Sequence, residues 1–541
     1  MNAPLNASAA LWPEHFYLID AAGTQQHGLA DDASRDSMGS KAWNLLRMAQ
    51  AGLPVPAALV VGTHFAHHRK QYQTALRETG LPALEQATGQ KLGDPRKPLI
   101  VSVRSGAPIS MPGMMETLLN IGLCDATLPG LLRQTGNPRL VWDAYRRLVA
   151  SYGEVVAGLP ASLFENELQR ITQGRDERQL DFSELRELTQ SFLLLYQQHA
   201  GHPFPQDVHT QLLQAVHAVF ASWEADKARQ YRRLNGIDEA MGTAVTIQRM
   251  VFGNAGGRSG AGVGFTRNPS TGEPVLWIDF LANAQGEDVV SGRRNAHGHE
   301  VMADLLPEAW QALEQATVRL EQIFADMQDF EFTVEEGQLH MLQARSGKRT
   351  PLAAARIALD LHAEGLIDTD TARERTAGLQ PDDLATSHLA DDSGTPARPA
   401  AEAASACSGV CSGEIVLDTA RARQRAAEGR SVILVRPDAE THDIAALELS
   451  VGLLTRHGAR TSHAAVVARQ LGKVCLVGCD TLGIDMAARS LQLGDLQLRE
   501  GDTLTLDGNQ GLIYLGTIAT VKQPDPEVIA RLQALREQQP A

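Results

Sequence analysis

A histidine lies at the start of a helix-like segment near residue 460. Ser462-His463 precedes Ala464–Leu471, whose apolar residues fall at helical spacing on one face. Thr461 or Ser462 is a good N-cap, so His463 is expected in the first turn. Backbone N–H groups at a helix start attract anions, and an imidazole is nucleophilic near neutral pH. The position therefore suits a phosphoryl group carried on His463, although a lone histidine at a helix start is more often a cap or a core residue.

Two carboxylates are spaced to point to the same side of a predicted strand. Asp329 and Glu331 are two residues apart, and strand side chains alternate between faces. If residues 336–338 form a three-residue loop, Glu331 lies opposite Gln343 on the returning strand. In the same register, Asp329 lies opposite Arg345. A two-residue loop would shift the register by one residue and turn Gln343 to the other face.

This hairpin would offer converging oxygen ligands with a guanidinium beside them. Oxygen donors suit Mg²⁺, which neutralises a triphosphate and keeps part of its own water shell. The ordinary alternative is a half-exposed hairpin with a cross-strand ion pair. The spacing alone leaves both interpretations open.

Two cationic residues lie where phosphate can be held. Lys41 is at the entrance of a helix predicted over Ser37–Gly52, although a solvated lysine would give the same pattern. Arg104 follows the buried-strand pattern Pro98–Val103, and its planar fork can bind phosphate oxygens. The loop Ser110–Met115 carries apolar side chains that are expected to close over a nucleotide.

The composition is that of an ordinary soluble, multidomain protein. The chain has 541 residues, which predicts two to four domains, and a formal charge of −15. This charge, without a basic stripe, gives no reason to expect nucleic-acid binding. No segment reaches the ~18 apolar residues that span a bilayer, and the N-terminus lacks the features of a signal peptide. Five cysteines favour a reducing, cytoplasmic location, and the spacing of four of them is unusual for a zinc site.

The pattern along the chain changes three times. Residues 124–240 are predicted to be mostly helical, with an apolar stripe along 206–232 that is typical of a core. Residues 243–350 favour strands and glycine-rich turns. A linker rich in Pro, Ala, Ser and Asp follows at 380–413. The next folding unit must have an aliphatic core, because Tyr514 is its only aromatic residue.

Four stretches together resemble one known family. They are GSKAWNLLRMAQAGLPVP around Lys41, VSVRSGAPISMPGMMETLLNIGL around Arg104, MQDFEFTVEEGQLHMLQARSGKRT in the hairpin and GLLTRHGARTSHAAVVARQLGK around His463. Each resembles the corresponding segment of the pyruvate, phosphate dikinase and phosphoenolpyruvate synthase family, and the likeness runs in matching order over residues 36–520. The sequence Thr461–Ala465 is similar to the phosphohistidine motif of that family.

The resemblance implies a mixed α/β and α+β multidomain fold. Residues 1–380 would form a two-lobed ATP-grasp nucleotide-binding domain, with lobes at about 1–240 and 241–380. Residues 381–405 would be a linker, 406–520 a swivelling α/β phosphohistidine domain, and 521–541 a C-terminal helix or tail. A mobile histidine domain needs such a linker to reach the nucleotide.

The resemblance also implies roles for individual residues. It makes His463 the nucleophile that takes phosphate from ATP, and Arg104 a catalytic group on the transferring phosphate. The metal ligands would be Glu331 and Gln343, holding Mg²⁺. The residues expected to bind ATP are Lys41, Arg104, Glu287, Asp329 and Arg345. The expected products are AMP and phosphohistidine, after inorganic phosphate or water removes the outer phosphate.

The sequence departs from the family pattern in two places. Family members continue into a barrel that binds phosphoenolpyruvate or pyruvate and needs about 250 residues, whereas only residues 521–541 follow residue 520 here. The approach to the histidine is His457-Gly458-Ala459-Arg460 instead of arginine-glycine-glycine-methionine, and Arg460 is closer to the synthase branch. The expected acceptor is therefore pyruvate or another molecule bound by a separate chain, and a homo-oligomer is left open.

Two alternative functions use the same residues. One is a split phosphotransferase component that acts on a different small acceptor, such as an alcohol or a phenol. The other is a non-catalytic, nucleotide-binding regulatory protein. Such a regulator would have no need of His463, so the presence of that residue beside the nucleotide-binding motifs favours an enzyme.

Overall fold

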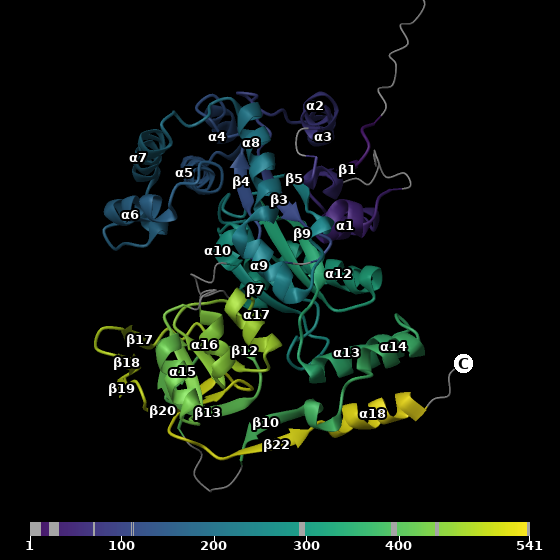
Figure 1. Cartoon of the computed structure of the whole chain (residues 1–541), viewed down its shortest axis with the longest axis vertical. Coiled ribbons are helices and arrows are strands. Elements are labelled where there is room, and N and C mark those ends of the chain that lie inside the picture. Colours follow the sequence, from purple (N-terminus) through teal and green to yellow (C-terminus); the bar gives the residue numbers. More distant parts are fainter. Residues whose placement is uncertain are drawn as a thin grey trace, which may run out of the picture. The chain divides into compact units, whose positions relative to one another are not determined.

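The chain folds as two compact units. The computed structural model describes residues 12–20, 32–68, 71–109, 111, 113–290, 298–390, 398–438 and 443–537. The first unit contains the residues up to Val251 together with His340–Gln343, and the second contains Phe252–Leu339 and the residues from Ala344 onward. Several sheets with many helices make this a mixed α/β, multidomain architecture, which confirms the predicted fold class (Figure 1).

The first unit is built on a five-stranded antiparallel sheet in the order β1-β2-β5-β3-β4. Its strands are β1 (Phe16–Ile19), β2 (Ala58–Val61), β3 (Val101–Gly106), β4 (Thr117–Ile121) and β5 (Ala244–Arg249). Most of their side chains are buried, because helices pack against the sheet. The strand predicted over Pro98–Val103 is present as β3, although it begins and ends three residues later.

Nine helices of the first unit surround this sheet within the described ranges. They are α1 (Arg35–Gln50), α2 (Tyr72–Ala75), α3 (Leu81–Thr88), α4 (Leu128–Thr135), α5 (Pro138–Val155), α6 (Ala161–Thr172), α7 (Phe182–Ala200), α8 (Val208–Ala221) and α9 (Asp226–Asn235). Helices α5, α6 and α7 pack on one another (Figure 1). The predicted helical region 124–240 is confirmed. Its apolar stripe along 206–232 is core as predicted, but a 3₁₀ turn at Ser222–Glu224 divides it between α8 and α9.

A four-stranded sheet in the order β7-β6-β8-β9 opens the second unit, except that His340–Gln343 of β9 belong to the first unit. Its strands are β6 (Gly260–Phe265), β7 (Trp277–Ala282), β8 (Gln328–Glu335) and β9 (Gln338–Ser346), accompanied by α10 (Gly286–Val290), α11 (His299–Leu305) and α12 (Pro307–Phe324). The glycines of β6 are structural. A Cβ added at Gly262 would lie 2.3 Å from the Phe332 ring, and one added at Gly260 would lie 2.3 Å from the Phe280 ring. Glycine therefore lets aromatic rings from the neighbouring strands cover β6.

An eight-stranded sheet in the order β11-β21-β20-β13-β14-β15-β16-β12 carries the histidine segment. Its strands are β11 (Ala401–Glu402), β12 (Ala404–Cys407), β13 (Val410–Val416), β14 (Val432–Arg436), β15 (Gly452–Thr455), β16 (Val474–Val477), β20 (Thr503–Asp507) and β21 (Leu512–Leu515). The four strands from β13 to β16 run parallel and alternate with α15 (Thr419–Ala427), α16 (Ile444–Leu449) and α17 (His463–Gln470). Parallel strands joined through helices need both faces covered.

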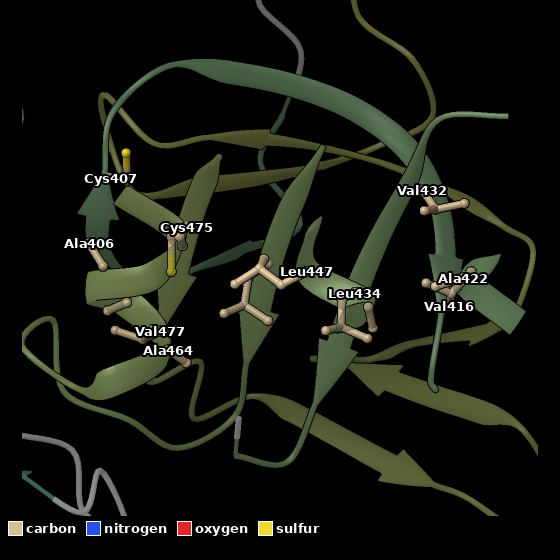
Figure 2. Close-up of a cluster of buried hydrophobic side chains, with 14 residues drawn as sticks. Ala406, Cys407, Val416, Ala422, Val432, Leu434, Leu447, Ala464, Cys475 and Val477 are labelled. Carbon is tan, nitrogen blue, oxygen red and sulfur yellow. The ribbon is translucent and has the colours of Figure 1, made fainter. Parts of the chain in front are cut away.

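Both faces of this sheet are covered by aliphatic side chains. On one face, Ala422, Leu447 and Ala464 from the three helices pack against strand residues such as Leu434 and Val477 (Figure 2). On the other face the core includes side chains from a small sheet of β17 (Leu482–Asp485), β18 (Ser490–Leu493) and β19 (Leu496–Arg499). The predicted aliphatic core is confirmed.

A two-stranded ribbon and three helices complete the second unit. Strand β10 (Ala385–Leu389) pairs with β22 (Thr520–Pro524), and α18 (Pro526–Glu537) packs on α13 (Pro351–Ala363) and α14 (Thr369–Thr376) (Figure 1). Part of the predicted linker thus forms a strand, and residues 391–397 lie outside the described residues. The domain boundaries stay a prediction. None of the helices in the described part of the chain combines the length and hydropathy needed to cross a membrane.

Candidate functional site

The histidine segment forms the helix start that the sequence predicts. Helix α17 begins at His463, and the Ser462 hydroxyl accepts a hydrogen bond of 3.4 Å from the Ala465 amide, so Ser462 is the N-cap. The segment follows β15, and ligands of parallel sheets bind where strands end and helices begin. The His463 side chain lies outside the described part of the structure, but its backbone stands at an anion-binding position.

A buried carboxylate fixes the segment that leads into α17. Asp279 on β7 is 2% exposed. It accepts hydrogen bonds from Arg460 Nε at 2.9 Å, from the Thr461 amide at 2.8 Å and from the Thr461 hydroxyl at 2.9 Å. The Arg460 guanidinium also lies 4.5 Å from the centre of the Trp277 ring. Asp279 is not among the residues expected from the sequence, where its signal is a single charge inside the apolar strand WIDFLA.

A second group missed from the sequence is the buried Arg469 at the end of α17. Its Nε and Nη2 atoms donate to the Ala406 carbonyl at 3.2 and 2.8 Å. Its guanidinium lies 5.1 Å from the Phe265 ring centre and 5.2 Å from that of Trp277. Burial lowers the pKa of Arg469, and nearby Asp329 is among the groups that oppose this effect. Arg469 therefore ties the end of α17 to both its own sheet and the aromatic residues of β6 and β7.

The turn of the hairpin differs from the predicted one. Strand β8 ends at Glu335 and β9 begins at Gln338, so the loop has two residues. The three-residue loop, on which the pairing of Glu331 with Gln343 was conditional, is therefore not formed. Glu336 and Gly337 both have positive φ, 49° and 87°. This is the backbone that a tight two-residue hairpin requires, and it usually selects Asn-Gly or Asp-Gly. Glu336 occupies the first of these positions.

The acidic pair of the hairpin lies beside an arginine. Arg345 Nε donates to Asp329 Oδ2 at 2.8 Å, so these two side chains meet although the loop has two residues. Burial raises the pKa of Asp329, Arg345 opposes that rise and the charge of Glu331 adds to it. Burial alone would lower the pKa of Arg345, but Asp329 and Glu331 outweigh it and raise that pKa. Three predicted site residues thus share one electrostatic environment.

The chemistry of this group fits a divalent cation. Asp329 and Glu331 supply hard oxygen donors, and their mutual repulsion is relieved when positive charge is added. No set of three or more His, Cys, Asp or Glu side chains in the described ranges is itself arranged to hold a metal ion. The ligand pair Glu331 and Gln343 for Mg²⁺ stays a prediction.

In the first unit, close backbone packing brings Lys41 beside β3. The Ser40 amide donates to the Ala107 carbonyl at 2.9 Å. Gly39 has φ of 76°, and a Cβ there would lie 1.8 Å from the Gly106 carbonyl oxygen, so only glycine allows this approach. Arg104, two residues before Gly106 on β3, contacts Gln343 Oε1 at 3.5 Å through Nη2. Lys41, Arg104 and Gln343 therefore belong to one unit.

Two further predicted features are Glu287 and the loop Ser110–Met115. Glu287 is exposed in the first turn of the five-residue helix α10 in the second unit. In the loop Ser110–Met115, Ser110 and Pro112 lie outside the described residues, and the methionines pack with Trp223 and Tyr231. The role of Glu287 in ATP binding and the closure of the loop over a nucleotide stay predictions.

Two family models match the chain. Residues 78–307 match the model described as pyruvate phosphate dikinase, AMP/ATP-binding domain. Residues 429–511 match the model described as PEP-utilising enzyme, mobile domain. Arg104 and Glu287 lie within the first match and His463 lies within the second, whereas Lys41 and the hairpin residues lie outside both.

Several curated proteins are similar over most of the chain. Pyruvate, phosphate dikinase, chloroplastic, from Mesembryanthemum crystallinum is 43% identical over 491 residues, which is 89% of this chain and 52% of that protein. Pyruvate, phosphate dikinase 1, chloroplastic, from Arabidopsis thaliana is 41% identical, with 88% and 51% covered. Pyruvate, phosphate dikinase from Rhizobium meliloti (strain 1021) is 41% identical, with 93% and 58% covered. The chain spans about half the length of the curated relatives it matches.

Proposed function

Because the chain belongs to the pyruvate, phosphate dikinase family over its ATP-binding and mobile domains, we propose that it is a dikinase-type phosphotransferase in which ATP phosphorylates His463. One observation carries the proposal. His463 is the first residue of α17, follows a parallel strand and lies inside the match to the mobile domain. A nucleophilic imidazole at a helix start can accept and hold a phosphoryl group.

The transfer proceeds in two balanced steps. An imidazole nitrogen of His463 attacks the β-phosphorus of ATP, the N–P bond forms and the bond from Pβ to the α,β-bridging oxygen breaks, so AMP leaves with that electron pair. An oxygen of inorganic phosphate then attacks the γ-phosphorus and displaces phosphohistidine from it, which releases pyrophosphate. Water in place of phosphate would release inorganic phosphate. Stabilisation of spreading negative charge is the main catalytic need of both steps.

Positive groups of the chain meet that need. Lys41 and Arg104 would bind phosphate oxygens in the first unit, and Arg345 would do so beside Asp329. Glu287 would contact the nucleotide. Mg²⁺, held through Glu331 and Gln343, would neutralise charge on the triphosphate when it is bound. Arg104 would have the catalytic role, because its guanidinium would offset the negative charge that spreads over the transferring phosphoryl group in the transition state.

The proposed final acceptor is pyruvate or another small molecule, bound by a separate chain or barrel. The similar proteins are pyruvate, phosphate dikinases, which supports pyruvate and phosphate as substrates. A different acceptor, such as an alcohol or a phenol, is the alternative that partner addition tests. A cytoplasmic location and a homo-oligomer stay predictions.

Labelled ATP tests the proposal. The purified chain is incubated with Mg²⁺ and ATP labelled at the β or γ phosphate, with and without inorganic phosphate, and acid-labile label on the protein is measured together with AMP. The β label is expected on the wild-type chain and absent from His463→Ala. His199→Ala, at the exposed end of α7, is the matched histidine control and should label as the wild type does.

The outcomes separate the candidate functions. Equal labelling of wild type and His463→Ala would overturn the assignment of the nucleophile. ATP binding without label under any condition would overturn phosphotransfer and favour the nucleotide-binding regulatory protein. The γ label retained without phosphate and released with it would show the pyrophosphoryl step directly.

A further inference from the structure

A cavity of about 850 Å³ in the first unit has no part in the proposed transfer. It lies between the end of α5, the middle of α8 and the start of β4. Glu154 and Val155 at the end of α5 and the C-cap residue Val156 line it, and Leu213 and His217 line it from α8. A volume in this range is typical of sites that hold small molecules.

The charges in this cavity are unequal. Two carboxylates, Glu116 and Glu154, line it. Lys227 Nζ donates to Glu116 Oε1 at 2.6 Å and so balances that carboxylate. Glu154 has no hydrogen-bonding or ion-pairing partner within the part of the chain that the structure describes. One negative charge of the cavity is therefore left to solvent or to a ligand.

The surroundings of Glu154 disfavour its charge. Burial raises the pKa of Glu154, and the neighbouring charge of Glu116 raises it further, whereas Lys227 opposes the rise. Glu165 adds a smaller repulsion. A cation placed directly against Glu154 would relieve this repulsion, which favours binding of a positively charged ligand.

Much of the rest of the wall is aliphatic, and its polar members are Gln73, Gln214, His217 and Ser222. Val155 and Val156 continue from Glu154, and Leu213, Ala218 and Ala221 face the cavity from α8. Such a surface favours a hydrocarbon body, since apolar area removed from water contributes about 25 cal/mol per Å². The cavity thus joins one unbalanced carboxylate to a hydrophobic wall.

We propose that this cavity binds a small organic cation, an ammonium that pairs with Glu154 and carries an apolar body that lies against Val156 and Leu213. The cavity is connected through β4 to β3, the strand that carries Arg104. Glu116 directly precedes β4, and Thr117 of β4 pairs with Arg104 of β3. The proposal does not depend on phosphotransfer, so binding alone tests it.

A pair of isosteric probes tests the charge requirement. 4-Phenylbutylamine and the neutral 4-phenylbutan-1-ol are titrated into the full chain at pH 7.5 and low salt by calorimetry, with the His217 ring resonances followed by NMR. The amine is expected to bind about five- to tenfold more tightly than the alcohol, and to shift the His217 signals. The alcohol reports the contribution of the apolar wall alone.

Two variants locate the charge. Glu154→Gln is expected to weaken amine binding about five- to tenfold and to leave alcohol binding unchanged; Glu154 is exposed enough that the fold should tolerate the change. Glu187→Gln on α7 removes the same charge from an exposed site outside the cavity and should leave both affinities unchanged. Equal affinity for amine and alcohol, an unchanged amine affinity in Glu154→Gln, or no binding of either probe would overturn the proposal.

Discussion

Two sheets of the second unit handle charge in opposite ways. In the sheet β7-β6-β8-β9, Asp279 and Asp329 are buried on the strands, and each accepts from an arginine, Arg460 and Arg345. In the eight-stranded sheet, both covering layers are aliphatic. The first sheet therefore carries buried ion pairs on its strands, whereas the second has aliphatic cores on both faces and ion pairs such as that of Arg436, the last residue of β14, with Asp443. The difference shows where each sheet can carry charged functional groups. The sheet β7-β6-β8-β9 carries them on its strands, and the eight-stranded sheet carries His463 at a helix start beyond a strand end.

The largest effect is expected from a core change in the aliphatic sheet. The eight-stranded sheet and the helices that cover it are called the histidine fold. Leu434 on β14 is fully buried in it, so Leu434→Ala should destabilise this fold by about 3 kcal/mol through lost burial and a residual cavity. Hydrogen exchange of β14 and β15 amides measures this fold by itself. Since no charge is involved, the loss should be the same at pH 5.5 and pH 7.5. A loss that changed with pH would break the comparison.

Arg345→Met should destabilise the sheet β7-β6-β8-β9 by about 2 kcal/mol at pH 7.5, because buried Asp329 loses its cation. The loss is limited because Arg345 is partly exposed, so water can replace part of its interaction with Asp329. The pKa of Asp329, already raised, should rise further. An acid whose pKa is raised on folding favours the folded state at low pH and loses that stability as pH rises. The loss should therefore shrink at pH 5.5, measured by exchange of β8 amides, and Arg345→Met with Asp329→Asn should recover part of it.

Asp279→Asn should have a smaller, local effect. The amide keeps the shape of the carboxylate but loses its charge-assisted hydrogen bonds to Arg460 and Thr461, at a cost of about 1 kcal/mol. The Thr461 amide should exchange about fivefold faster. Asp304→Asn, at an exposed position of α11, is the matched control. Unchanged exchange at Thr461 would contradict a fixing role for Asp279.

The smallest effect is expected at the cap of α17. Ser462→Ala removes a hydrogen bond of 3.4 Å and should destabilise the helix start by about 0.5 kcal/mol, at the low end for N-caps. Ser462→Asn keeps an acceptor and should restore most of the loss. Exchange of the Ala465 amide is the measurement. A loss above that of Asp279→Asn would show that the cap, not the buried carboxylate, holds this segment.

Local signals predicted much of the fold. The start of α17, strand β3 and the helices between residues 124 and 240 follow from caps, apolar runs and helical spacing, all of which lie within a few residues. The two-residue hairpin turn could not be chosen from the sequence, because Glu336 adopts a left-handed backbone that its residue type does not favour. That turn is imposed by the strands on either side of it.

The supporting contacts of the candidate site could not be predicted in the same way. Asp279 meets Arg460 and Thr461 from about 180 residues away along the chain, and the spacing of residues in the sequence carries no record of such a contact. Arg469 has the helical spacing of an exposed residue, but it is buried against Trp277 and Phe265. Only the folded arrangement of distant strands gives these side chains their roles.

The ribbon of β10 and β22 has a mechanical consequence. The chain enters the histidine fold after β10 and leaves it through β22, so both tethers run through five paired residues from Ala385 to Leu389. The exit is anchored, because Arg356 pairs with Asp525 and Arg531 with Asp360. Both connections therefore run through one paired ribbon, so the predicted swivelling of this fold would require β10 and β22 to bend or twist together.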